Sequence, residues 1–234
     1  MGNHTVTSFD EELGAIDRLI RDMGDLAESM VEAAIRALLD SDPVLAQRTV
    51  SDDAIMDARQ RELDDRAITL IAKRQPMAQD LRAVVGAIRM AGDLERIGDL
   101  AKNIAKRVNV VGEAPTPHSL AHGIEAMSTL VLAQIRSVVE NYVSRKADVL
   151  PQLRAADEQI DVSYTAVFRE LLTYMMEDPR NITACTHLLF CAKNLERIGD
   201  HVTNIAENAY YVMTGQQLSP DRPKLDETSM TAPA

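Results

Sequence analysis

Carboxylates recur four residues apart at corresponding places in the two halves of the sequence. The pairs are Glu95/Asp99 and Glu196/Asp200, with Asp53/Asp57 and Asp157/Asp161 upstream of them. Asn103 and Asn204 extend the downstream pairs by four more residues. Side chains four apart on a helix are neighbours, and like charges there repel each other. At about 100° per residue, each Glu, Asp and Asn set therefore forms a stripe of oxygen ligands on one helix.

These stripes could bind metal ions if a second helix brings its own acidic pair alongside. Four carboxylates and an amide would then meet, and a divalent or trivalent cation would relieve their repulsion. All-oxygen ligands suit Mg²⁺, Ca²⁺, Mn²⁺ or iron better than Zn²⁺. The alternative is a solvated polar face, since 36 acids in 234 residues would give about as many acidic pairs by chance. The spacing predicts metal binding and leaves the identity of the metal open.

A glycine lies inside each downstream stripe. Gly98 and Gly199 are expected in mid-helix, where glycine costs about 1 kcal/mol relative to alanine. We therefore expect another helix to pass close to each of them.

Catalytic motifs are weak by comparison. The Glu-x-x-His motif of di-iron bundles is missing, because Ala184 stands three residues before His187. No glycine-rich phosphate loop or Ser-His-Asp order is recognisable. A hydrolase that activates water on a carboxylate-bound metal stays open as an alternative function.

The elements that position these residues are expected to be helices. Nine prolines divide the chain into six segments and a tail, and proline starts or ends helices. Apolar residues recur at alternating steps of four and three, which is typical of antiparallel bundles. Gly112 and Gly215 follow the third and sixth segments, where left-handed cap residues are expected. Aromatic residues make up only 3% of the chain, and the pattern predicts an all-α protein.

An internal repeat divides the chain into two halves. Leu-Glu-Arg-Ile-Gly-Asp occupies 94–99 and again 195–200, an offset of 101 residues (195 − 94). The repeat predicts two similar units of three helices each. The expected boundaries are an N-terminal extension over 1–8, a first bundle over 9–113, a second bundle over 118–215 and a disordered polar tail over 216–234.

Charge and hydropathy exclude several classes of protein. The formal net charge is −11 and no dense block of Lys and Arg occurs, which argues against a nucleic-acid-binding protein. No apolar run approaches the roughly 18 residues of a membrane span, and no signal peptide is recognisable at the N-terminus. Cys185 and Cys191 fit small core residues in a reducing compartment. We therefore expect a cytoplasmic protein without membrane insertion.

The twin hexapeptides resemble those of the PhoU family of phosphate-signalling regulators. The likeness runs from about Phe9 to Met213 and includes Met-Gly-Asp-Leu-Ala-Glu at 23–28 and Gln75-Pro76 before the third segment. It implies two pseudo-symmetric three-helix bundles, with metal ions or clusters on Glu95/Asp99 and Glu196/Asp200 and on the facing pairs Asp53/Asp57 and Asp157/Asp161. Histidine often follows Gly-Asp in the family, as at His201, but Leu100 stands there in the first half. The two metal sites are therefore expected to differ.

The resemblance also implies a function without catalysis. Members act as negative regulators of phosphate uptake and of the phosphate-starvation response, between the high-affinity phosphate ABC transporter and a sensor histidine kinase. A purely structural helical protein is the third alternative, beside the regulator and the hydrolase. A long bundle with an apolar seam could also form a homodimer.

Overall fold

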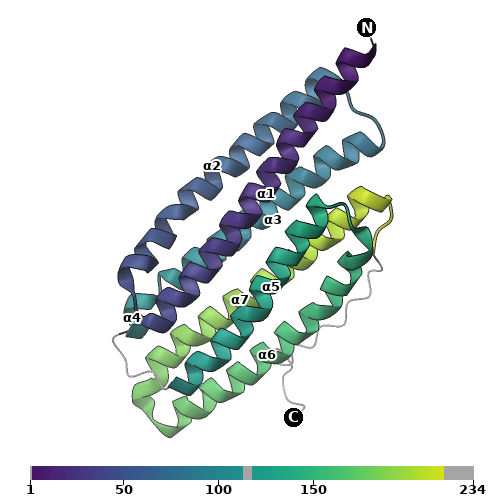
Figure 1. Ribbon diagram of the computed structural model, residues 1–234. Helices are drawn as coiled ribbons and strands as arrows, with labels where there is room; N and C mark the ends of the chain where they lie inside the picture. The colour runs from purple at the N-terminus through teal and green to yellow at the C-terminus, as the bar shows by residue number, and fades with distance from the viewer. Residues whose placement is uncertain (1, 113–117, 219–234) are drawn as a thin grey trace.

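The computed structural model describes residues 2–112 and 118–218 (Figure 1). The helices are α1 (Gly2–Asp40), α2 (Pro43–Arg74), α3 (Gln79–Ala105), α4 (Val108–Gly112), α5 (His118–Val143), α6 (Leu150–Glu177) and α7 (Ile182–Thr214). Two 3₁₀ turns, η1 (Ala147–Val149) and η2 (Pro179–Asn181), precede α6 and α7. Neither described stretch contains a strand. The predicted all-α fold is confirmed.

The six long helices form two three-helix bundles. Helices α1, α2 and α3 pack on one another, as do α5, α6 and α7. The bundles join along two seams, where α3 packs against α7 and α1 packs against α5, while α2 and α6 lie on the outside (Figure 1). This arrangement confirms the predicted pair of pseudo-symmetric bundles.

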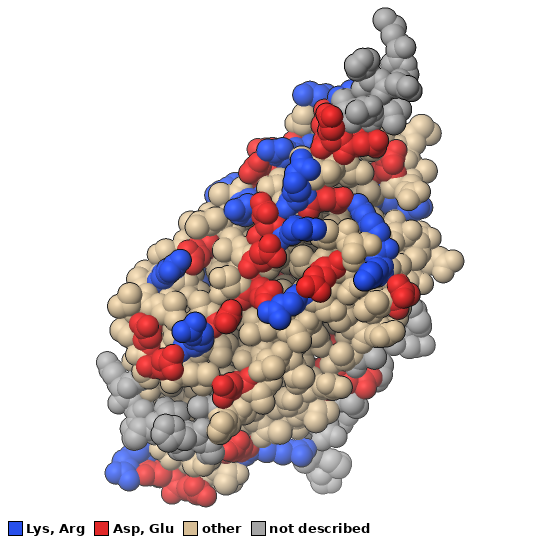
Figure 2. Space-filling view, viewed as in Figure 1, with Lys and Arg blue, Asp and Glu red and all other residues tan. Residues whose placement is uncertain are grey.

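The two bundles differ at their surfaces. On the face shown in Figure 2, Lys and Arg alternate with Asp and Glu over the first bundle, whereas the visible described surface of the second bundle is mostly uncharged. On this face, therefore, the pattern of charge is not repeated as the backbone is.

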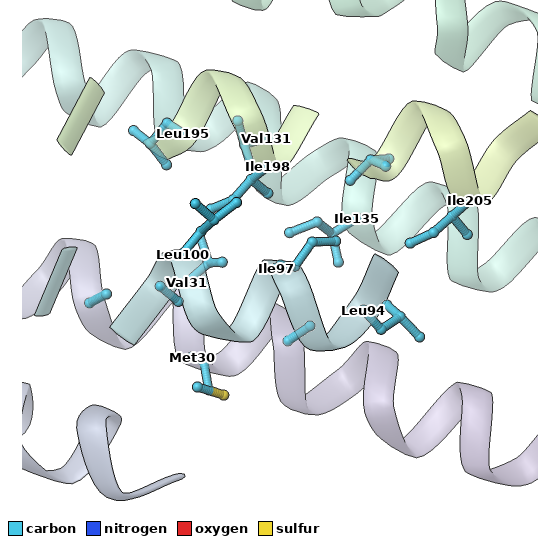
Figure 3. Close-up of a cluster of buried hydrophobic side chains, with 14 of the residues drawn as sticks. Met30, Val31, Leu94, Ile97, Leu100, Val131, Ile135, Leu195, Ile198 and Ile205 are labelled. Atoms are coloured by element: carbon cyan, nitrogen blue, oxygen red, sulfur yellow. The ribbon is translucent and has the colours of Figure 1, made fainter. Parts of the chain in front are cut away.

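The core is mostly aliphatic and is continuous across both bundles. Figure 3 shows a part of it to which α1, α3, α5 and α7 all contribute. The labelled residues are Met30, Val31, Leu94, Ile97, Leu100, Val131, Ile135, Leu195, Ile198 and Ile205. Burying each such side chain contributes about 1.5–3 kcal/mol. The predicted apolar seams therefore join the two bundles as well as the helices within each.

Helix ends follow the expected capping chemistry at two places. The carboxylate of Asp42 accepts hydrogen bonds from the amides of Val44 and Leu45, and Pro43 is the first residue of α2. Gly215 ends α7 with φ 74°, which confirms the predicted left-handed cap. The cap predicted at Gly112 stays a prediction, since the five residues after it lie outside the described part of the chain.

The third predicted helix is broken where a single helix was expected. Helix α3 ends at Ala105, and a turn at Lys106 and Arg107 separates it from α4. The turn brings Arg107 to α7, where Nη1 lies 3.0 Å from His187 Nδ1 and the guanidinium stacks 4.4 Å from the centroid of the Phe190 ring. The prediction of one continuous third helix was wrong. The spacing of apolar residues within the segment does not reveal the contact of Arg107 with α7.

Several other sequence predictions concern the ends and the linker. Helix α1 begins at Gly2, so residues 2–8, predicted as a separate extension, continue into it. Residues 113–117 of the joint and 219–234 of the tail lie outside the described residues.

Cys185 and Cys191 are buried free thiols, and burial raises the pKa of Cys191 to about 12. Within the described ranges, every helix is too short or too polar to cross a bilayer.

Candidate functional site

The acidic pairs of the first bundle meet between α2 and α3. Asp53 and Asp57 lie on α2, and Glu95 and Asp99 lie on α3. Lys102, one turn after Asp99, places its Nζ 2.7 Å from Asp53 Oδ2 and 2.5 Å from Asp99 Oδ1. The predicted convergence of carboxylates is present, and a lysine ammonium bridges two of them.

Burial and neighbouring charges act in opposite directions on the two acids of α3. Burial, with the charge of Asp99 next in size, raises the pKa of Glu95, whose side chain is 13% exposed. Burial alone would also raise the pKa of Asp99, but the hydrogen bond and charge of Lys102, with Arg96 adding to them, lower it overall. The charged form of Asp99 is therefore stabilised, whereas burial disfavours the charged form of Glu95.

The second bundle places its acidic pairs between α6 and α7. Asp157 and Asp161 lie on α6, and Glu196 and Asp200 lie on α7. Lys193 Nζ lies 2.9 Å from Glu196 Oε1, whereas Glu196 Oε2 is buried without a hydrogen-bond partner. Burial raises the pKa of Glu196, and Lys193 offsets only part of that effect.

The position of Lys102 is occupied by a different type of residue in the second bundle. The offset of 101 residues places Thr203 where Lys102 stands (203 − 102). Thr203 is 1% exposed, and its Oγ1 is another buried oxygen without a hydrogen-bond partner. Lys193 corresponds to Gly92 (193 − 101) and approaches Glu196 from a different turn of α7. The two bundles therefore place their cations differently.

The glycines inside the stripes lie at close helix contacts, as predicted. A Cβ at Gly199 would lie 2.7 Å from Asp157 Oδ1 and 3.0 Å from Ile160 Cδ1 on α6. A Cβ at Gly98 would lie 3.2 Å from Met56 Cγ on α2. Glycine therefore lets the outer helix of each bundle approach the acidic stripe.

The two asparagines of the predicted ligand set are not gathered with the carboxylates. Asn103 is exposed on α3. Asn204 Nδ2 donates to Asp93 Oδ1 at 3.4 Å, across the seam between α7 and α3. His201 Nδ1 lies 2.9 Å from the same oxygen, so His201 faces the other bundle.

Sequence reasoning missed Lys102 and Asp93. Lys102 was detectable, because it follows Asp99 by three residues, a spacing at which helix side chains meet. Its bridge to Asp53 on α2 and the contact of Asp93 with α7 depend on how the helices face one another, which spacing within one helix does not reveal.

The fit to a metal ion differs between the clusters. Nowhere in 2–112 and 118–218 do three or more His, Cys, Asp or Glu side chains already form a metal-binding set. In the first bundle the ammonium of Lys102 lies between Asp53 and Asp99, so those residues do not fit an ion as they stand. Glu95 Oε2 in the first bundle, and Glu196 Oε2 and Thr203 Oγ1 in the second, are buried acceptors that a cation could satisfy. Each cluster therefore offers a buried carboxylate oxygen to a cation, and in the first cluster the ammonium of Lys102 would have to move.

Comparison with known sequences shows the same two units. The family model described as PhoU domain matches residues 20–108 and 124–209, one in each bundle. The phosphate-specific transport system accessory protein PhoU homolog of Rhizobium meliloti (strain 1021) is 56% identical over 226 residues, 97% of this chain and 95% of that protein. The protein of the same name from Caulobacter vibrioides (strain NA1000 / CB15N) is 48% identical over 229 residues, 98% and 100% of the two chains.

Solved structures agree with this likeness. The crystal structure of PhoU from Pseudomonas aeruginosa matches with a TM-score of 0.83 and 33% identity, over 89% of this chain and 100% of that one. The phosphate transport system regulatory protein PhoU from Streptococcus pneumoniae matches with a TM-score of 0.82 and 27% identity, over 90% and 99%. Sequence motif, helix order and backbone geometry agree over nearly the whole chain, which belongs to the PhoU family.

Proposed function

We propose that this protein is an accessory regulator of phosphate transport that represses uptake and the phosphate-starvation response when phosphate is ample. The observation that carries the proposal is the 56% identity, over 97% of the chain, to a phosphate-specific transport system accessory protein PhoU homolog. In this role the protein acts in the cytoplasm without catalysis. It docks on the high-affinity phosphate ABC transporter and on a sensor histidine kinase.

Deletion of the gene tests this role. In phosphate-rich medium, a deletion strain should express its phosphate-scavenging genes, and the wild-type gene should restore repression. Normal repression in a deletion strain without a paralogue would contradict the proposal. Assays of the purified protein with phosphate esters separate the regulator from the hydrolase, because the regulator controls expression without turnover.

We further propose that the acidic clusters bind a metal ion, and that the second bundle binds it more tightly. Glu196 and Asp200 would hold the ion together with Asp157 and Asp161 from α6. Support comes from the buried Glu196 Oε2, which has no hydrogen-bond partner. All-oxygen ligands suit Mg²⁺, Mn²⁺, Ca²⁺ or iron. When bound, the ion supplies positive charge that offsets the repulsion among the carboxylates.

We propose that the first cluster also binds a metal ion, but only after a rearrangement of Lys102. Glu95 and Asp99 would hold an ion with Asp53 and Asp57 only after Lys102 withdraws its ammonium. That exchange costs the two ion pairs of Lys102, so we expect the affinity to be lower here.

Thermal melts of Asp99→Asn and Asp200→Asn test both metal proposals. An ion that binds only the native state raises stability by RT ln(1 + [L]/Kd). With Mn²⁺ or Mg²⁺ in place of chelator, the midpoint of the wild type should rise, and Asp200→Asn should lose more of that rise than Asp99→Asn. An equal rise in the wild type and both variants would remove Asp99 and Asp200 from the sites.

A further inference from the structure

An open groove of about 590 Å³ lies between α1 and α2, beside the end of α5. Four arginines line it, two from α1 and two from α2: Arg18, Arg21, Arg59 and Arg66. Leu19 and Val143 contribute apolar surface to the same lining. The volume falls in the range of small-molecule sites, and the groove lies away from both acidic clusters.

The carboxylates of the groove already have partners. Asp22 pairs with Arg59 at 3.0 Å, and Glu62 pairs with Arg66 at 2.6 Å. Asp17 accepts a hydrogen bond from the hydroxyl of Tyr142 at 2.6 Å and pairs with Arg145 at 2.6 Å. The negative charges that line the groove are therefore each matched by a cation.

The arginines of the groove carry more positive charge than the neighbouring carboxylates balance. Among the described residues, neither Arg18 nor Arg21 has an acidic partner within ion-pair distance. Arg59 pairs through Nη1, while its Nε is buried without a hydrogen-bond acceptor. A buried donor without an acceptor is costly, so an anion that reaches Arg59 would be favoured.

The fold does not require these arginines. The family segments begin at residues 20 and 124, an offset of 104 (124 − 20) that also relates Asp53 to Asp157. The same offset relates the four arginines to His122, Glu125, Ser163 and Glu170. The second bundle therefore builds the same helices with no arginine at these positions and with acids at two of them. The cluster is a property of the first bundle in a chain of net charge −11.

We propose that this groove binds a small molecule that carries two or more linked phosphate groups. Guanidinium groups match phosphate oxygens with paired hydrogen bonds. A single carboxylate would compete with Asp22 and Glu62 at equal charge. A di- or triphosphate brings several negative charges, so it can engage Arg18 and Arg21 and also draw Arg59 and Arg66 from their partners.

Two sources of linked phosphates share this chemistry. A bare polyphosphate chain would use the arginines alone, whereas a nucleotide would also place its base against apolar surface such as Leu19 and Val143. The inference goes beyond the regulatory function and does not depend on it, because binding is measured on the purified protein.

Isothermal titration of the full chain with sodium tripolyphosphate, ATP and inorganic phosphate tests the proposal. Chelator is present throughout, so that metal at the acidic clusters does not contribute. Tripolyphosphate should bind saturably at one per chain, and more tightly than inorganic phosphate. Tighter binding of ATP would identify a nucleotide site, and equal binding would identify a site for the phosphate chain alone.

Matched variants locate the site. The double variant Arg18→Ala/Arg21→Ala should weaken tripolyphosphate binding about tenfold or more, and Arg59→Gln should weaken it as well. Arg48→Ala and Arg89→Ala replace exposed arginines outside the groove and should stay within about twofold of the wild type. The double variant removes no ion pair, so its helical circular dichroism and melting point should match the wild type.

Several outcomes would overturn the proposal. The first is the absence of saturable binding of tripolyphosphate and ATP to the wild type. An equal loss of affinity in Arg48→Ala, Arg89→Ala and the double variant would show only general attraction of anions. Tighter binding of a hexaglutamate peptide than of tripolyphosphate would assign the groove to an acidic protein segment instead.

Discussion

The two bundles place corresponding acidic pairs on corresponding helices, but the residue one turn after each downstream pair differs. Lys102 bridges Asp53 and Asp99 between α2 and α3. In the second bundle the corresponding residue is Thr203, whose buried hydroxyl has no hydrogen-bond partner. The repeated motif therefore determines where carboxylates gather, while the residue one turn after it differs between the bundles.

Removal of Lys102 should produce the largest effect. Lys102→Met leaves Asp53 and Asp99 partly buried without their shared cation, so we expect it to lower the free energy of unfolding by about 2–3 kcal/mol. Thr203→Val is the matched control, and it should be neutral or slightly stabilising, because Thr203 Oγ1 has no partner to lose. Urea denaturation of both variants measures the difference. A cost of only a few tenths of a kcal/mol for Lys102→Met would show that the bridge contributes little.

The glycines give the next contrast. Gly199→Ala places a Cβ 2.7 Å from Asp157 Oδ1, and we expect a net cost of about 1–2 kcal/mol after the gain in helix propensity. Gly98→Ala meets the flexible Met56 at 3.2 Å, so clash and propensity should nearly cancel, within about 0.5 kcal/mol. Thermal melts of the two variants measure the difference in stability between them. Equal midpoints would mean that α6 adapts to the extra methyl group as easily as α2.

A smaller effect should depend on pH. Burial, with Lys193 offsetting part of it, raises the pKa of Glu196 above its unfolded value. The native state therefore holds this proton more tightly, and the contribution of Glu196 to stability falls as pH rises through the interval between the unfolded and native pKa values.

Glu196→Gln removes that penalty. The variant should be more stable than the wild type at neutral pH, and the difference should shrink as the pH falls below about 4.3, the ordinary pKa of glutamate, because the residue becomes protonated in both states. Glu95→Gln should show the same sign with a smaller gain, because Glu95 is more exposed and Arg96 opposes its shift. A stability gain for Glu196→Gln that does not change with pH would contradict this origin.

The smallest contrast lies at the seam between the bundles. His201 pairs with Asp93, whereas the corresponding positions of the other half hold Leu100 and Asn194. The substitutions His201→Leu and Asp93→Asn place the residues of the other half at these two positions. A double-mutant cycle of the two substitutions tests the contact. We expect a coupling energy of about 0.5–1 kcal/mol. Additive single variants would mean that the contact does not hold the bundles together.

The fold was predictable because its signals are local and repeated. The steps of four and three around Leu94 and Leu195 identify helices, and the twin hexapeptides identify two units. Convergence of the acidic pairs followed from packing those helices. Lys102 as a bridge, the break of the third helix at Lys106 and Arg107, and the turn of Asn204 toward Asp93 were not predictable, because each depends on the rotation of one helix against another.

The shared core shown in Figure 3 has a consequence for synthesis of the chain. Helices α1, α2 and α3 are consecutive, so the first bundle can form while α5 to α7 are still being translated. Until then, Ile97 and Leu100 lie on a face that α5 and α7 cover in the finished protein (Figure 3). Exposed apolar surface of this kind makes nascent chains prone to aggregate. Docking of the second bundle is therefore the step that protects a newly made molecule from its neighbours on the ribosome.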